Sequence, residues 1–384
     1  MTESKEEKSN DEADQVPRIL DPDFLDRTAC LRQDMHNDWI SVLAAENSRR
    51  ISDANEWNHV FHTPRSAEYI FTACTRLRLP QEVKYSALLI FDNFMVQLVS
   101  RLHESVYNSK QSDRKKYYEW NRIEATLSRQ TTLRMLSSIQ IASKMHSYNE
   151  VGELWSYFET LITGSPFTIM IHLCLAVVLF VTVCGFQLEE AICLKMTQLQ
   201  FYGTSLSVQT VKLCLKTLGF AYTEESVVRS ELRVLSMIDW EPAYHCTPLV
   251  YIESLFKILI VETKWGQNVE ASDYWQYILL VLDCVFIHWD DVYNRMMGNV
   301  LGPSAEIITR EQMCRVQADW FLLACGVIVT AACCIDGMQA ADEVTNELHH
   351  LSNIPLADIT DMSVAIIECV ISQQGSIAAT SIRI

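Results

Sequence analysis

The chain has 384 residues, more than one typical domain, and its 49% hydrophobic content can fill one or two buried cores. It carries 48 acidic side chains against 31 Lys and Arg, a formal net charge of −17. Because this charge repels the phosphate backbone, direct, sequence-independent duplex binding is not expected. The thirteen cysteines show no CxxC pair and have mostly apolar neighbours, which indicates an intracellular protein with reduced thiols.

Glycine and proline are few, eleven and nine, and long segments repeat apolar residues at spacings of three and four. These features predict an all-helical protein. Residues 1–21 are polar and acidic and predict a disordered tail. An N-terminal helix is expected within residues 22–54, from Pro22 to about Arg50, with Asp21 placed to cap it.

The next predicted helices cover Ser66–Arg78 and Gln81–Arg101, with Pro80 between them. The segment Asn108–Arg122 mixes charges with aromatic residues. It predicts a solvated loop, with a basic contact patch as the alternative. A helix over Arg134–Met145 is apolar on nearly every side and carries small residues, so we expect it at the centre of a bundle.

Two further helices are predicted over Ser207–Phe220 and Thr223–Trp240, the second capped by Thr223. One of the two apolar stripes of the second helix includes the carboxylate of Glu231. An unpaired buried carboxylate costs several kcal/mol or changes its pKa. We therefore expect a Lys or Arg beside Glu231.

From Pro242 onward a second apolar set of about five helices is expected, over Thr247–Val261, Asp273–Met296, Gln312–Ile335, a shorter helix ending near Leu351, and Ala357–Ile371. The repetition suggests two similar bundles joined near residues 240–246. The expected domains are residues 55–240 and 241–375, followed by a tail over 376–384.

The helix order, with the elements "LRMLSSIQIASKM" and "ESVVRSELRVLSMIDW", resembles the cyclin box. The Ala-Ser-Lys element ends at Lys144, the Glu-x-x-x-Leu element begins at Glu231, and an Asp-x-Phe ending falls at Asp92 and Phe94. Within the cyclin superfamily the sequence is similar to a meiotic branch that acts at crossover sites. The resemblance implies tandem five-helix cyclin-box bundles, the second divergent and degenerate, and the first carrying an atypical insert.

The resemblance also implies a non-catalytic scaffold in the nucleus, on meiotic chromosomes. A cyclin-dependent kinase and meiotic crossover and mismatch-repair factors are the expected partners, and no cofactor or metal is expected. In kinase-activating cyclins a Lys and a Glu form a pair beside the docking face for the kinase, and by motif these are Lys144 and Glu231. Two interpretations stay open: the pair docks a kinase, or it only locks two helices together.

The sequence departs from the cyclin pattern in two places. Residues 145–147, Met-His-Ser, stand where kinase-binding cyclins have an aromatic residue and two Glu, which removes acidic contacts that a kinase could use. The substrate-docking patch of the family would fall at His62, Ser66 and Tyr69. We expect a polar surface there that does not recruit apolar peptides.

About 55 residues, 151–206, interrupt the first box, and they contain an uncharged run over 167–186 that is long enough to span a bilayer. A crossing there would put Lys144 and Glu231 on opposite sides of the membrane, so no membrane association is expected. We favour sequence foreign to the functional protein, such as translated intron. An extra helix packed on the bundle and a single-span membrane protein are the alternatives.

Motifs for nucleotide binding, zinc proteolysis or a nucleophile elbow are missing from the sequence. His288, Asp290 and Asp291 lie in one short segment and predict a polar surface, because they do not converge as metal ligands. Cys333 and Cys334 are expected to pack in the core of an apolar helix. A competing function, a tandem-cyclin-fold transcription-associated factor, needs a basic face that this acidic chain lacks.

Overall fold

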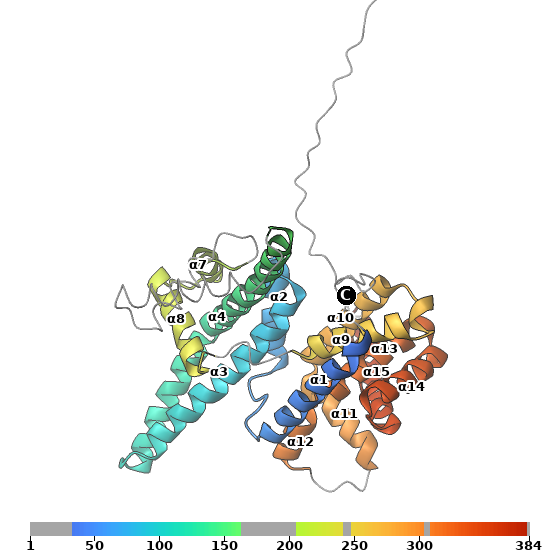
Figure 1. Cartoon of the computed structure of the whole chain (residues 1–384). Helices are drawn as coiled ribbons and strands as arrows, with labels where there is room; N and C mark the ends of the chain where they lie inside the picture. Colours follow the sequence, from blue (N-terminus) through green and yellow to red (C-terminus); the bar gives the residue numbers. More distant parts are fainter. Residues whose placement is uncertain (1–32, 163–204, 241–246, 303–307, 382–384) are drawn as a thin grey trace, which may run out of the picture.

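The computed structural model describes residues 33–162, 205–240, 247–302 and 308–381. Within these ranges the chain forms thirteen α-helices and no strand, which confirms the all-helical prediction (Figure 1). The helices are α1 Gln33–Asp53, α2 Pro64–Arg76, α3 Gln81–Tyr107, α4 Asp113–Ile162, α7 Val208–Thr217, α8 Glu224–Met237, α9 Pro248–Glu262, α10 Ala271–Ile287, α11 Trp289–Leu301, α12 Arg310–Gln317, α13 Trp320–Asp336, α14 Met338–Ser352 and α15 Leu356–Ser381. The expected acidic tail and the apolar run over 167–186 lie outside the described residues.

A first group of helices, α2, α3, α4, α7 and α8, packs around the middle of α4. Residues 133–144 of α4 are all buried, as expected for the centre of a bundle. The predicted loop over 108–122 is wrong from residue 113 onward, because α4 already begins at Asp113. Glycine and proline are both missing from residues 108–122, so nothing in this polar segment breaks a helix.

The far ends of α3 and α4 run side by side beyond the rest of the first group (Figure 1). We call residues 99–132 the arm. In the arm only Val106 is buried. The two helices therefore contact each other without a further layer of helices to cover them.

A second group, α9 to α15, surrounds α13, whose residues 320–332 are all buried. Two helices that the sequence predicts as continuous are each divided: α10 ends before α11 at His288, and α12 ends before α13 near Asp319. The second break has a clear cause, because the Asp319 carboxylate accepts the Leu322 N–H at 2.9 Å and so begins a new helix. The second group has seven α-helices in its described part instead of about five.

Helix α1 packs against the second group and completes the N-terminus of α13. The side-chain oxygen of Asn47 accepts the N–H groups of Trp320 and Phe321 at 3.0 and 3.3 Å, and its amide donates to Asp319 at 2.8 Å. The guanidinium of Arg50 lies 3.7 Å from the centre of the Trp320 ring. Asn47 thus satisfies backbone donors that a helix N-terminus leaves free.

Among the described helices, none has by itself both the length and the apolar composition of a membrane span. Helices α12 and α13 meet these criteria only when they are taken together, and they are bent by 61° at the break between them.

Candidate partner-binding site

Lys144 and Glu231 meet between α4 and α8, although 87 residues separate them in sequence. The Lys144 Nζ donates to Glu231 Oε1 at 2.6 Å, and the two side chains are 5% and 3% exposed. Thr223 sets the start of α8, since its hydroxyl accepts the Ser226 N–H at 3.2 Å. The cation expected beside Glu231 is present, and it is Lys144.

The Lys144–Glu231 pair fixes two helices relative to each other. Oε2 of Glu231 is buried and has no hydrogen-bond partner among the described residues, so the carboxylate depends on Lys144 for its neutralisation there. Removing one member of a buried pair strands the other charge away from water, at a cost of about 3–5 kcal/mol. The position of the pair as a kinase-facing site stays a prediction.

Separate hydrogen bonds also join α4 and α8 beside this pair. The Arg134 guanidinium donates to Ser230 Oγ at 2.7 Å, and the hydroxyls of Ser230 and Ser137 are also 2.7 Å apart. Burial lowers the pKa of Arg134 to about 10. We call the contact formed by Arg134, Ser137, Lys144, Ser230 and Glu231 the α4–α8 seam. Its paired polar groups specify one register for the two helices.

The residues that follow Lys144 turn inward. His146 is half-buried, its Nε2 lies 2.9 Å from Ser86 Oγ, and burial lowers its pKa to about 4. Met145 packs against the core of the first group. Neither side chain supplies the negative charge that kinase-binding cyclins carry after the Ala-Ser-Lys element.

The expected polar surface at His62, Ser66 and Tyr69 is wrong, because His62 and Ser66 are buried and Tyr69 is half-buried. The Nε2–H of His62 donates to the Phe286 carbonyl at 2.7 Å, and its ring stacks on Trp289 with centroids 4.8 Å apart. Burial lowers the pKa of His62 to about 4. The second group covers this position, and the tertiary contact that does so is not visible in local sequence.

Asp92, the aspartate of the Asp-x-Phe ending, holds the loop between α1 and α2. Its carboxylate accepts the N–H groups of His59 and Phe61 at 3.0 and 2.7 Å. Burial raises the pKa of Asp92 to about 6, while these backbone N–H groups act in the opposite direction. His59 is also buried, and burial lowers its pKa to about 3.

Lys84 and Asp283 form a second ion pair, between α3 and α10, that sequence reasoning missed. The Lys84 Nζ donates to Asp283 Oδ2 at 2.7 Å, and the Tyr85 hydroxyl donates to Oδ1 at 2.6 Å. Burial, and then the charge of Asp283, raise the pKa of Tyr85 well above its ordinary value. The sequence does contain a signal for this pair. Lys84 is a charged residue among largely apolar positions of α3, directly after the buried Val83, and a buried Lys needs an acidic partner.

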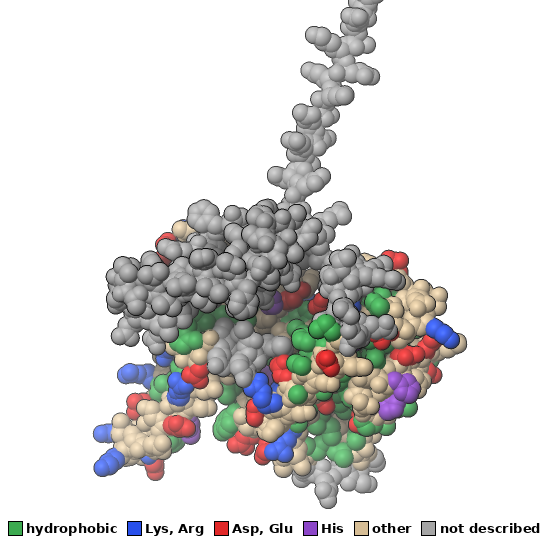
Figure 2. All heavy atoms as spheres, viewed as in Figure 1, with side chains coloured by type: hydrophobic (Ala, Val, Ile, Leu, Met, Phe, Trp, Pro, Cys, Tyr) green, Lys and Arg blue, Asp and Glu red, His purple; other side chains and the backbone are tan. Residues whose placement is uncertain are grey.

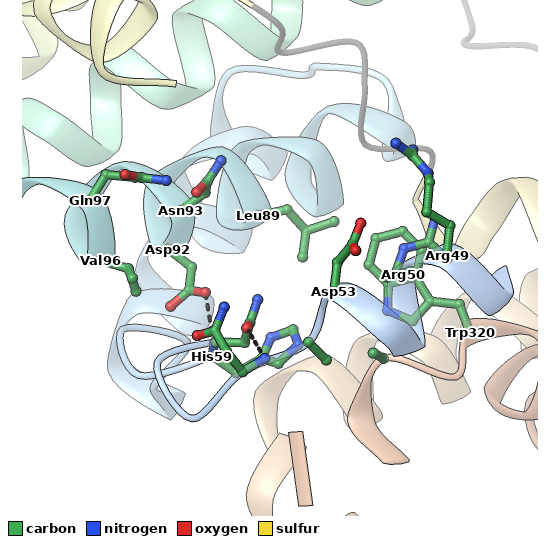
Figure 3. Close-up of a pocket in the computed structure, with 14 residues that line it drawn as sticks. Arg49, Arg50, Asp53, His59, Leu89, Asp92, Asn93, Val96, Gln97 and Trp320 are labelled. Carbon is green, nitrogen blue, oxygen red and sulfur yellow. Dashed lines mark hydrogen bonds between the residues drawn. The ribbon is translucent and has the colours of Figure 1, made fainter. Parts of the chain in front are cut away.

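A cavity of about 320 Å³ opens between α1, α3 and the start of α13 (Figure 3). Most of the residues that line it are polar and include Asp53, His59, Asp92, Asn93 and Gln97, with Trp320 closing one side. His59 has a left-handed backbone with φ 60°, and its buried Nδ1 has no described partner. The lining mixes acidic, basic and amide groups, so it favours no single charge on a ligand.

The remaining candidate residues do not form a reactive site in the described part of the chain. No three His, Cys, Asp or Glu side chains there are placed to hold a metal ion. Asp290 accepts from Gln317 at 3.2 Å and Asp291 from Arg295 at 3.1 Å. The core position expected for Cys334 is wrong, because its side chain is exposed in the last turn of α13.

The chain is similar to cyclin N-terminal domain-containing protein 1 of Homo sapiens, with 23% identity over 326 residues that cover 85% of this chain and 81% of the human protein. The Mus musculus protein of the same name is 22% identical over 326 residues, 85% of this chain and 80% of the mouse protein. No protein-family model matches the chain, and no solved structure matches it. These relatives confirm the cyclin resemblance that the motifs indicate.

Proposed function

We propose that this chain, a relative of cyclin N-terminal domain-containing protein 1, is a non-catalytic cyclin-like regulator that engages a cyclin-dependent kinase and promotes crossover designation and maturation in meiosis. The observation that carries the proposal is the Lys144–Glu231 pair. It joins α4 and α8 at the two positions that the cyclin motif assigns to the kinase-facing pair. The relatives support a regulatory role, because cyclin domains are regulatory modules.

In this proposal the kinase lies against the residues around the α4–α8 seam, whose own five side chains are buried. The Glu231 carboxylate is buried, so in this proposal the Lys144–Glu231 pair acts by holding α4 and α8 in the register that the kinase binds. The seam is already ordered by the bonds of Arg134 and Lys144. A partner that binds an ordered surface loses less conformational entropy than one that must arrange the side chains itself.

The proposed interaction holds a kinase in place more than it activates one. Met145 and His146 bring no carboxylate to the seam, and His146 is bound to Ser86 inside the first group. The scaffold would therefore position a kinase among crossover and mismatch-repair factors on meiotic chromosomes. The meiotic part of the proposal rests on the sequence resemblance.

A double variant tests whether the Lys144–Glu231 pair is needed for kinase docking or only holds two helices together. Replacing both charges, in Lys144→Met with Glu231→Leu, leaves no stranded charge and is expected to keep the fold. The matched control is Lys212→Met with Glu224→Leu, an ion pair between α7 and α8 whose side chains are 44% and 53% exposed. Tagged protein is purified from meiotic tissue, and the kinase that accompanies it is measured by mass spectrometry.

The expected result is that the Lys144/Glu231 variant loses the kinase while the Lys212/Glu224 variant retains it. Kinase recovered equally with both folded variants would show that the buried pair only locks two helices. The meiotic role is tested separately, by immunostaining of meiocytes and by counting crossovers in a null allele. Missing chromosomal foci together with normal crossover numbers would end that part of the proposal.

A further inference from the structure

The arm, residues 99–132, contributes only partly buried apolar side chains to the core of the first group, among them Val99, Leu102 and Leu127. Its two helices contact each other, but only Val106 is buried within it. A pair of helices ordinarily buries its apolar face against a further layer, and the arm has no such layer among the described residues. The arm is therefore suited to a contact with another molecule.

The charge of the arm is opposite to that of the whole chain. Residues 99–132 contain seven Lys and Arg against four Asp and Glu, whereas the chain contains 31 against 48. Six of the seven are exposed: Arg101, Lys110, Arg114, Lys115, Arg122 and Arg129. Figure 2 shows Lys and Arg side chains along the projecting arm. Within the described part of the chain, none of the seven forms an ion pair.

The arginines of α4 follow one side of the helix. Arg114, Arg122 and Arg129 are eight and seven residues apart, close to two helical turns in each case, so their side chains project in similar directions. Tyr118 lies one turn after Arg114, is 60% exposed, and has the Arg114 guanidinium 5.9 Å from its ring centre. These residues form a continuous basic and aromatic stripe without an acidic member.

An apolar hollow of about 320 Å³ lies at the base of the arm, between α3 and α4. Its apolar lining is Phe61, Phe91, Met95, Val99, Trp120 and Leu127. Trp120 also meets His103 edge to face, with ring centroids 5.4 Å apart, and so connects the hollow with the aromatic residues nearer the tip. The hollow has room for apolar side chains, and the stripe beside it attracts negative charge.

We propose that the arm docks an acidic amphipathic segment of a partner protein. Apolar side chains of the segment enter the hollow, and its carboxylates pair with the arginines and lysines of the arm. The hollow and the basic side chains together recognise the segment, in the same way that an apolar groove binds an amphipathic helix. This surface contains neither Lys144 nor Glu231, so the inference does not depend on kinase binding.

Charge complementarity favours an acidic peptide over a nucleic acid duplex. In physiological salt, charges act over a Debye length of about 8 Å, so a short segment on the arm is screened from the acidic remainder of the chain. A duplex extends further and meets that remainder, which repels it. The apolar lining of the hollow also suits a peptide better than a phosphate backbone.

The test uses the full chain and two labelled probes in fluorescence anisotropy. The first probe is a helical peptide of about 16 residues with Leu or Phe at positions i, i+3, i+4 and i+7 and Glu at the others. The second is a DNA duplex of about 20 base pairs. The arm variant is Arg114→Glu, Arg122→Glu, Arg129→Glu. Its control, Arg65→Glu, Arg76→Glu, Lys216→Glu, makes the same charge change at exposed positions elsewhere.

The hollow has its own variant pair. Ser128→Trp places a bulky ring at the edge of the hollow, and Ser105→Trp places one at an exposed position of α3 that does not line it. The peptide is expected to bind the unaltered chain, at least about tenfold more weakly to the arm variant, and more weakly to Ser128→Trp. Both control variants should bind it as the unaltered chain does.

Four results with these probes and variants would overturn the proposal. They are no peptide binding to the unaltered chain, equal binding to the arm variant and its control, unchanged binding to Ser128→Trp, and tighter, arm-dependent binding of the duplex. A chain lacking residues 1–21 is measured in parallel, because that segment is acidic. Peptide binding that appears only after this deletion would assign the arm to the chain's own N-terminus and would also overturn it.

Discussion

The imidazole of His62 stacks on the indole of Trp289, with ring centroids 4.8 Å apart and the ring planes at 25°. His62 precedes α2 in the first group and Trp289 begins α11 in the second, so the stack joins the two groups. His59 lies against the same indole at 5.1 Å. Burial lowers the pKa of His62 to about 4 and that of His59 to about 3, so both rings are neutral at pH 7.

This neutrality predicts that the free energy of unfolding falls as the pH drops below about 6.5. His59, His62 and His146 stay neutral in the folded chain down to pH 4 or lower, whereas in the unfolded chain they bind protons near pH 6.5. The unfolded state then holds more protons, so acid favours it. Asp92 acts in the opposite direction, because its pKa of about 6 makes the folded carboxyl take up a proton first.

With three histidines against one carboxyl, the net change between pH 7.5 and pH 5 is expected to be a loss of at least about 2 kcal/mol. Urea denaturation at a series of pH values measures it. The slope should be smaller in His62→Gln and unchanged in His350→Gln, whose side chain is exposed. A free energy of unfolding that stays constant over this range contradicts the prediction.

The buried pair at the α4–α8 seam predicts a non-additive pattern of stabilities. Glu231→Ala should lower the free energy of unfolding by about 3–5 kcal/mol, since it leaves the Lys144 ammonium buried without its partner. The double variant Lys144→Met with Glu231→Leu should lose much less, because it removes both charges. Guanidinium denaturation of the three proteins gives the comparison. Equal losses in the single and double variants would mean that packing, not charge, sets the cost.

A further prediction concerns Asp283, which binds two residues of α3 at once. Asp283→Ala removes the acceptor for the Lys84 Nζ and for the Tyr85 hydroxyl, both from buried residues. The expected loss is about 2–3 kcal/mol in thermal or urea unfolding, although Gln81 still accepts from Lys84. The control Asp342→Ala alters an exposed position of α14 and should change stability by less than about 0.5 kcal/mol.

Replacing Gly266 and Gly298 by Ala is expected to change the stability in opposite directions. A Cβ atom there would lie 2.3 Å from the Leu259 carbonyl oxygen and 2.4 Å from the Ile260 Cα, so the backbone after α9 would have to move. Gly266→Ala should therefore cost about 2–3 kcal/mol. At Gly298, in α11, a Cβ would meet nothing within 4 Å, and Gly298→Ala should stabilise by about 0.5–1 kcal/mol. Melting temperatures that move in the same direction for both would contradict this account.

The sequence predicts correctly those features that depend on residues close to one another along the chain. The Thr223 cap and the buried face of α8 follow from local pattern, and that face made a cation beside Glu231 a physical requirement. The family motif then named Lys144 among the available cations. The helical class followed from apolar spacing and from the scarcity of glycine and proline.

The features that the sequence does not predict depend on contacts between segments that lie far apart along the chain. His62 is covered by α10 and α11, more than two hundred residues further along, so its polarity alone suggested a surface. The break before α13 is fixed by Asp319 together with Asn47 of α1, and neither glycine nor proline marks it. The charge of residues 108–122 predicts a loop, yet α4 begins at Asp113 because no residue in this segment breaks a helix.

The hydrogen bonds between Asn47 and the start of α13 also limit when the second group can finish folding during synthesis. Asn47 precedes Trp320 by 273 residues, and synthesis proceeds from the N-terminus. Helix α1 therefore leaves the ribosome long before the helix whose first turn it satisfies exists. Until Trp320 and Phe321 emerge, Asn47 lacks the two backbone N–H donors that its side chain binds in the folded chain. The second group reaches its final form only when the earliest helix and one of the last to be made come together.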